Sequence, residues 1–118
     1  MTNGHINPAN VPDIALKDGH SIPQVGLGVL RIDAASGYNK GTKRETLWVT
    51  TKLRDSQQGY DSALKAFDNS LELLQLDYVD MYMIHWPTPF DWRSTDTWKA
   101  FVKLRDEGMA RTLGVCNF

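Results

Sequence analysis

Three short apolar segments decide the fold of this chain: WVTTKL (residues 48–53), YVDMYMI (78–84) and TLGVC (112–116). All three are rich in apolar, β-branched or aromatic residues, which is typical of buried strands. The stretches between them carry apolar residues three and four positions apart, and this spacing predicts helices over 59–76 and up to Gly108. In the second helix we expect Thr95 to cap the start, Trp98, Phe101 and Val102 to face inward, and Gly108 to mark the end.

The alternation of strand and helix predicts right-handed βαβ units with parallel strands that need cover on both faces. Composition and periodicity leave two architectures open, a doubly wound sheet and part of a barrel. A complete eight-stranded (β/α) barrel needs about 200 residues or more. The 118 residues of this chain therefore exclude a complete barrel.

The sequence before residue 48 is less regular. Residues 1–11 are rich in Asn, Gly and Pro and are predicted to form a disordered tail. Asp18-Gly19 between short apolar stretches predicts a hairpin, and residues 25–30 (VGLGVL) read as a short strand. The two glycines of that strand do not make a dinucleotide fingerprint, because Arg31 stands where the third glycine would fall.

Composition excludes several classes of protein. Lys and Arg total 13 and Asp and Glu total 14, so the formal net charge of −1 argues against a nucleic-acid or anionic-membrane binder. No apolar run approaches the roughly 18–20 residues of a membrane helix, and residues 1–20 do not resemble a signal peptide. A single cysteine, Cys116, excludes a disulfide scaffold and a multi-cysteine metal site. We expect a cytoplasmic protein without a metal.

Polar residues follow the three predicted strands at their carboxyl ends. These are Lys52, His85 and the pair Cys116-Asn117. Ligands of parallel α/β folds bind at this end of the sheet, so the residues are candidates for one site. A buried Lys52 would need a carboxylate partner. The alternative is that Lys52 is a salt-bridged structural residue and His85 a core histidine.

Several motifs together resemble the aldo-keto reductase family, and most of all its bacterial 2,5-diketo-D-gluconic acid reductases. They are VTTK (49–52), DYVD (77–80) followed by IHWP (84–87), and GVCNF (114–118), with IALKDG (14–19) and IPQVGLG (22–28) before them. The resemblance implies an α/β fold of the (β/α)8 TIM-barrel type. Residues 12–118 would form an incomplete barrel, an N-terminal hairpin followed by about half of the βα units. The segment 31–51 is too short for two helices and a strand, so the chain is internally shortened as well as truncated at its C-terminal side.

The resemblance also implies roles for individual residues. Family members reduce aldehydes and ketones with NADPH, using an Asp, Tyr, Lys and His tetrad. Lys52 matches the lysine, which lowers the pKa of the tyrosine, and His85 matches the histidine, which orients the carbonyl group. Asn117 matches a residue that holds the nicotinamide carboxamide, beside Cys116 where the family usually has serine. Trp86 resembles a substrate-pocket aromatic residue, although packing beside the following proline would also explain it.

The other two tetrad members depend on the alignment. Residues 33–38 (DAASGY) fit the family's Asp-x-Ala-x-x-Tyr pattern, which makes Asp33 the partner of Lys52 and Tyr38 the general acid. In the alternative alignment, Leu30 to Asp33 only continue the preceding strand into its loop. The true Asp and Tyr are then missing.

Three functions remain at this stage. The first is an NADPH-dependent reductase of small-molecule carbonyl compounds, related to 2,5-diketo-D-gluconate reductases. The second is an inactive fragment or pseudoenzyme that persists by self-association through open barrel edges. The third, a flavodoxin-like or Rossmann-like binding module, lacks the Gly-rich phosphate loop that it would need.

Overall fold

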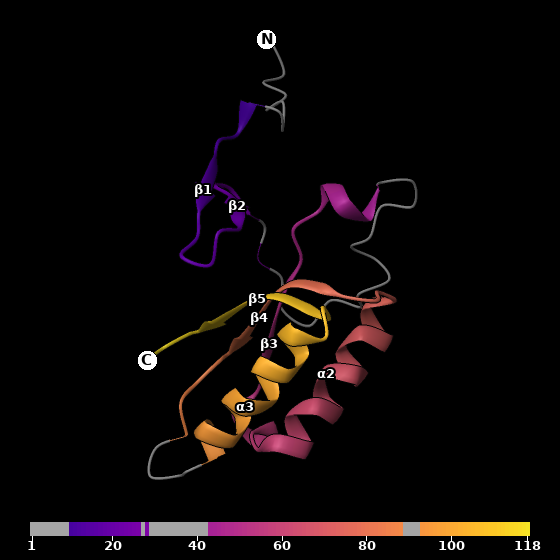
Figure 1. Cartoon of the computed structure of the whole chain (residues 1–118), viewed down its shortest axis with the longest axis vertical. Helices are drawn as coiled ribbons and strands as arrows, with labels where there is room; N and C mark the ends of the chain where they lie inside the picture. Colours follow the sequence, from indigo (N-terminus) through magenta and orange to yellow (C-terminus); the bar gives the residue numbers. More distant parts are fainter. Residues whose placement is uncertain (1–9, 27, 29–42, 89–92) are drawn as a thin grey trace. The chain divides into compact units, whose positions relative to one another are not determined.

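The computed structural model describes residues 10–26, 28, 43–88 and 93–118 (Figure 1). The chain divides into two compact units, Met1–Arg31 and Ile32–Phe118. Most of the predicted tail, together with Asp33 and Tyr38, lies outside the described residues.

The first unit contains the predicted hairpin. Strand β1 (Asp13–Ala15) pairs antiparallel with β2 (Ser21–Pro23). Gly19 adopts a φ of +88° in the connecting turn, which L-residues with a Cβ rarely adopt, and its N–H donates to the carbonyl of Leu16 at 3.2 Å. The Asp-Gly signal therefore predicted the turn correctly. The strand expected over 25–30 is not found at its described positions, 25, 26 and 28, which lie outside any strand.

The second unit is a parallel sheet with helices on one face. Figure 1 shows both long helices on the same side of the three strands, which pair in the order β3-β4-β5. The chain order confirms the predicted strand–helix alternation: η2 (Arg44–Thr46), β3 (Thr50–Leu53), η3 (Asp55–Gln57), α2 (Tyr60–Leu74), β4 (Val79–Ile84), α3 (Arg93–Asp106) and β5 (Ala110–Val115).

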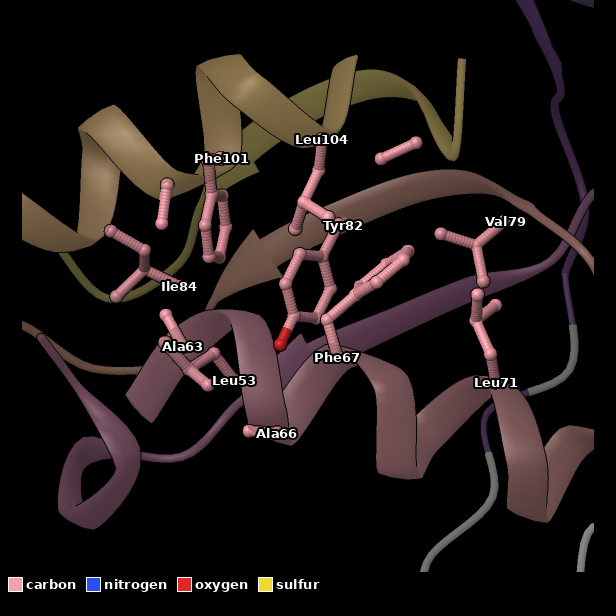
Figure 2. Packing of buried hydrophobic residues seen from close by; sticks show 12 residues of the cluster. Leu53, Ala63, Ala66, Phe67, Leu71, Val79, Tyr82, Ile84, Phe101 and Leu104 are labelled. Atoms are coloured by element: carbon pink, nitrogen blue, oxygen red, sulfur yellow. The ribbon is translucent and has the colours of Figure 1, made fainter. Parts of the chain in front are cut away.

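Aromatic rings form the centre of the core between the sheet and its helices (Figure 2). Tyr82 of β4 stacks on Phe101 of α3 with ring centroids 4.3 Å apart, and meets Phe67 of α2 edge-on at 4.7 Å. All three side chains are fully buried. Burial raises the pKa of the Tyr82 phenol well above its ordinary value, so this tyrosine stays neutral.

Helix α3 differs from its sequence prediction at its start and on its buried face. It begins at Arg93, so Thr95 lies in the first turn and does not cap the helix. Phe101 is buried as expected, but Trp98 is 38% exposed because the buried stripe runs through Thr97, Ala100 and Leu104. Thr97 belongs to this stripe because its hydroxyl accepts a hydrogen bond from the N–H of Gly59 at 2.8 Å.

The predicted end of α3 at Gly108 is correct. Gly108 has a φ of +76°, and its N–H and that of Met109 donate to the carbonyls of Arg105 and Leu104, both at 2.9 Å. This pair of bonds is a Schellman motif, which satisfies carbonyls that the helix leaves open. The polypeptide can then turn directly into β5.

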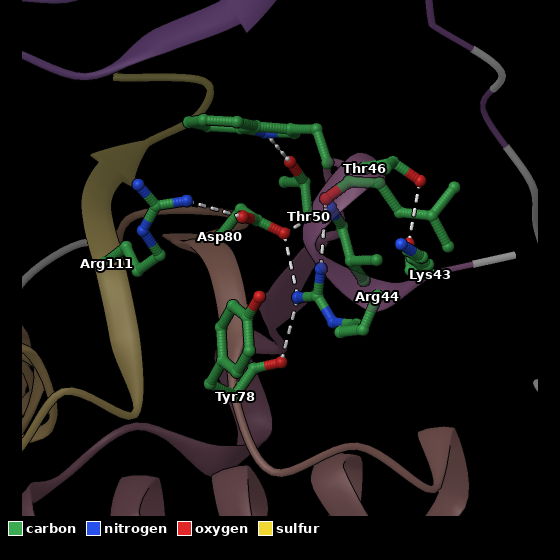
Figure 3. A network of polar contacts seen from close by, with 10 residues as sticks. Lys43, Arg44, Thr46, Thr50, Tyr78, Asp80 and Arg111 are labelled. Atoms are coloured by element: carbon green, nitrogen blue, oxygen red, sulfur yellow. Dashed lines mark hydrogen bonds and ion pairs between the residues drawn. The ribbon is translucent and has the colours of Figure 1, made fainter.

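A buried carboxylate ties the amino-terminal part of the sheet together (Figure 3). Asp80 of β4 is 2% exposed and accepts from Arg44 of η2 at 2.8 Å and from the N–H of Val49 at 2.8 Å. Its second oxygen accepts from Arg111 of β5 at 3.1 Å. Arg44, whose side chain is 15% exposed, also lies over the ring of Tyr78 at 4.0 Å. Asp80 therefore joins three elements that are far apart in the sequence.

The two arginines contribute unequally to this network, which gives a test. We expect Asp80→Asn to lower the free energy of unfolding by about 3 kcal/mol, because it leaves the buried Arg44 without a compensating charge. Arg111 is 45% exposed, so Arg111→Ala is expected to cost less than about 1 kcal/mol. Urea unfolding followed by circular dichroism measures both. Equal losses in the two variants would contradict this assignment.

Candidate active site

The register of the parallel sheet brings the predicted site residues to one edge. Lys52 is paired with Met83 of β4, and Met83 with Gly114 of β5. His85 directly follows β4, and Cys116 and Asn117 follow β5. The four polar residues singled out from the sequence thus sit at the carboxyl ends of three neighbouring strands, where parallel α/β folds bind ligands.

The backbone of His85 is held from both neighbouring strands. Its N–H donates to the carbonyl of Leu53 at 3.0 Å, and its carbonyl accepts from Asn117 Nδ2 at 2.7 Å. The N–H of Cys116 donates to the carbonyl of Ile84 at 2.9 Å, which continues the sheet beyond β5. These bonds fix the main chain that carries the imidazole, whose ring centroid lies 5.9 Å from that of Trp86.

Lys52 projects from the sheet face opposite the helices and is exposed in the described part of the chain. Thr50, two residues earlier on the same face, is also exposed. Lys52 forms no ion pair with a carboxylate in the described part of the chain. The carboxylate predicted to pair with it, Asp33, and the predicted general acid, Tyr38, lie outside that part.

Methionines line the strip between Lys52 and β5. A Cβ placed on Gly114 would lie 3.2 Å from Met83 Cε and 3.9 Å from Met81 Sδ. A larger residue at position 114 would therefore press against Met83. This close approach shows that both methionine side chains lie over the same face of β5 as Gly114.

Asn117 has the backbone conformation of a constrained residue. Its φ is +62°, in the left-handed region that asparagine adopts more readily than most residues. Nδ2 donates to the His85 carbonyl and lies 3.3 Å from Cys116 Sγ. Oδ1 accepts no hydrogen bond from any residue in the described ranges, and the side chain is exposed. Asn117 can therefore accept a hydrogen bond from an amide group of a ligand.

Trp86 and the loops beside it border open space. Half of the Trp86 side chain is exposed. A hollow of about 240 Å³ is lined by residues of the loops after β3 and β4 and by the start of α3: Asp55, Ser56, Pro87, Thr88 and Arg93.

One buried residue near the site was not expected from the sequence. Gln58 is 3% exposed and its Nε2 donates to the carbonyl of Trp86 at 2.7 Å. Its Oε1 lies 3.2 Å from Ser94 Oγ. Nothing in the local sequence marks this glutamine, because its burial depends on contacts with residues 28 and 36 positions further on.

None of the helices in the described ranges has the length and apolar character needed to cross a bilayer. Across the same residues, no three His, Cys, Asp or Glu side chains are grouped so that they could hold a metal ion.

Residues 17–118 match the Aldo/keto reductase family. An aldo-keto reductase of Mycolicibacterium smegmatis is 43% identical over 138 aligned positions, which cover 91% of this chain and 50% of the relative. The chain belongs to the aldo-keto reductase family and spans about half the length of the relatives it matches. The 138 positions exceed the 118 residues available, so the relative carries residues inside the aligned range that this chain lacks.

Solved structures give the same family and the fold. The aldo/keto reductase of Brucella melitensis is 41% identical with a TM-score of 0.84, covering 92% of this chain and 53% of its own. A variant of Gox0644 solved with NADPH is 35% identical with a TM-score of 0.78, and the match covers 92% of this chain and 50% of that chain. A putative 2,5-diketo-D-gluconic acid reductase B is 26% identical with a TM-score of 0.65, and the match covers 73% of this chain and 30% of that chain. The described sheet and helices are part of a (β/α)8 barrel.

Proposed function

We propose that this chain takes part in the NADPH-dependent reduction of a small-molecule carbonyl compound to an alcohol. The observation that carries the proposal is the shared strand edge at which Lys52, His85 and Asn117 meet. Family membership and an NADPH-bound neighbour support the cofactor. A substrate of the 2,5-diketo-D-gluconate type is the finer part of the proposal, supported by the motif resemblance and by one structural neighbour. We place the activity in the cytoplasm, because a lone cysteine suits a reducing compartment.

The residues present fit the nicotinamide end of NADPH. Asn117 offers an Oδ1 that accepts no bond from the described residues, while its Nδ2 is held by His85. That oxygen would accept from the amide of the nicotinamide carboxamide, with Cys116 Sγ beside it as a weak partner. When bound, NADPH supplies the hydride that reduces the carbonyl carbon.

The proton for the carbonyl oxygen would come from this chain. We assign Tyr38 as the general acid, with the ammonium of Lys52 lowering the pKa of its phenol and Asp33 pairing with Lys52. His85 would hydrogen-bond the carbonyl oxygen and hold it toward Tyr38. Trp86, half exposed beside His85, would bound the space for the rest of the substrate.

The proposal predicts that Tyr38→Phe lowers carbonyl reduction by at least about 100-fold, because the phenol proton is lost and the ring is kept. Tyr60→Phe is the matched control, since Tyr60 lies exposed on α2 and the same atom is removed. The rate is followed as loss of NADPH absorbance with an aldehyde series. An unchanged rate in Tyr38→Phe would show that Tyr38 is not the acid.

Affinity for the cofactor is a separate expectation. We expect the 118-residue chain to bind NADPH more weakly than a full-length relative, because it spans about half of that length. Fluorescence titration of the two proteins side by side gives both dissociation constants. Equal, stoichiometric binding would contradict this expectation.

A second candidate function is structural, and the open sheet favours it. Within the described residues, β3 and β5 each pair on one side only, and Thr50 and Lys52 on the face opposite the helices are exposed. Unpaired strand edges are templates for association with another chain. On this proposal the chain is an inactive member of the family that persists by pairing with a second copy of itself.

Sedimentation velocity across a range of concentrations tests the second candidate. Self-association predicts a dimer at concentrations where carbonyl reduction is undetectable. A monomer at every concentration would rule this candidate out. The reductase proposal is tested separately by comparing the rates of Tyr38→Phe and Tyr60→Phe.

A further inference from the structure

We infer that Gln58 is a positioning residue that fixes the His85–Trp86 segment for carbonyl reduction, an inference that rests on the proposed function. Gln58 lies in the loop after β3, the strand that carries Lys52, and its side chain reaches the loop after β4. It therefore connects the two loops that follow the Lys52 strand and the His85 strand. At 3% exposure, this side chain is almost fully removed from water.

The orientation of the Gln58 amide follows from its partners. The carbonyl of Trp86 only accepts hydrogen bonds, so the 2.7 Å contact requires the NH₂ group to face it. Oε1 then faces helix α3, where it lies 3.2 Å from Ser94 Oγ and 3.4 Å from Thr97 Oγ1.

The hydroxyl that donates to Gln58 Oε1 can also be assigned. Thr97 has one hydroxyl proton, and the carbonyl of Arg93 at 2.7 Å is a much better acceptor position than Gln58 Oε1 at 3.4 Å. Ser94 therefore donates to Oε1. Ser94 Oγ is also 2.8 Å from Thr88 Oγ1, and either hydroxyl can be the donor in that pair.

The result is a chain of hydrogen bonds that links Thr88, Ser94 and Gln58 to the Trp86 carbonyl. It begins and ends in the loop after β4, and passes through α3 and the loop after β3. Such a chain holds the amide in one orientation, because reversing it would place a carbonyl oxygen against a carbonyl oxygen.

This chain completes the support of His85. The bonds from His85 N–H to Leu53 and from Asn117 to the His85 carbonyl fix that residue on its two sides. Gln58 fixes the next carbonyl, one peptide unit further on. Without it, the Trp86 carbonyl loses a buried donor and the segment is free to shift. A displacement of a catalytic group by about 1 Å can lower the rate about 100-fold. We therefore expect a shift of the His85 ring to lower the rate of carbonyl reduction.

Gln58→Met tests the inference, because methionine keeps the length of the side chain and removes its hydrogen bonds. Gln57→Met is the matched control, since the side chain of the adjacent Gln57 makes no hydrogen bond to a described residue. We expect Gln58→Met to lower kcat by about 10-fold or more, with a dissociation constant for NADPH within about twofold of the unmodified chain. Destabilisation alone would reduce the amount of NADPH bound and leave kcat per bound site unchanged. That result would overturn the inference.

A second readout does not depend on activity. With 5-fluorotryptophan incorporated, the ¹⁹F resonance of Trp86 is assigned by Trp86→Phe, and that of Trp48, which precedes β3, serves as reference. We expect Gln58→Met to shift or broaden the Trp86 resonance and leave that of Trp48 in place, and Gln57→Met to change neither. An unmoved Trp86 resonance overturns the inference, whether or not the chain reduces carbonyls.

The two readouts separate the two ways of failing. A moved Trp86 resonance in a chain that reduces no carbonyl compound would show that the hydrogen-bond chain is present and that the proposed function is wrong. If Gln58→Met does not fold, Ser94→Ala removes the donor to Oε1 and is judged by the same two measurements.

Discussion

The site depends on one constraint, the parallel pairing of β3, β4 and β5 in a register that sets Lys52 beside Met83 and Met83 beside Gly114. Parallel strands in register end at the same edge, so residues from three distant parts of the sequence meet there. The aromatic core on the helix side, centred on Tyr82, stabilises this register from one face. The Asp80 network joins β4 to β5 and to η2 near the amino-terminal ends of these strands, away from the site.

Much of this arrangement could be predicted from the sequence, because its causes are local. Strand and helix periodicity, the Asp18-Gly19 turn and the Gly108 helix end all depend on residues close together in the chain. The burial of Gln58 and Asp80 could not be predicted. Each is stabilised inside the protein by partners about 30 or more positions away, and neighbouring residues carry no sign of those partners.

The error at Trp98 has the same origin. A large aromatic residue one position from the buried stripe was taken as part of it, whereas Thr97 fills that place through its bond to Gly59. For Lys52 the sequence predicted a carboxylate partner and left the burial of the side chain open. The helices cover only the opposite face of the sheet, and Lys52 is exposed in the described part of the chain. The sequence pattern therefore identified elements better than it identified which face each side chain occupies.

On the proposed function, the edge formed by Lys52, His85 and Cys116-Asn117 receives the nicotinamide of NADPH. Cys116 is the only cysteine and is half-buried at that edge, so its reaction with a thiol reagent reports on the site directly. We predict that saturating NADPH slows this reaction several-fold. In a Cys116→Ser, Asp68→Cys variant the thiol stands at an exposed position of α2, and NADPH is expected to leave its reaction rate unchanged. A Cys116 reaction rate unchanged by saturating NADPH would contradict the proposal.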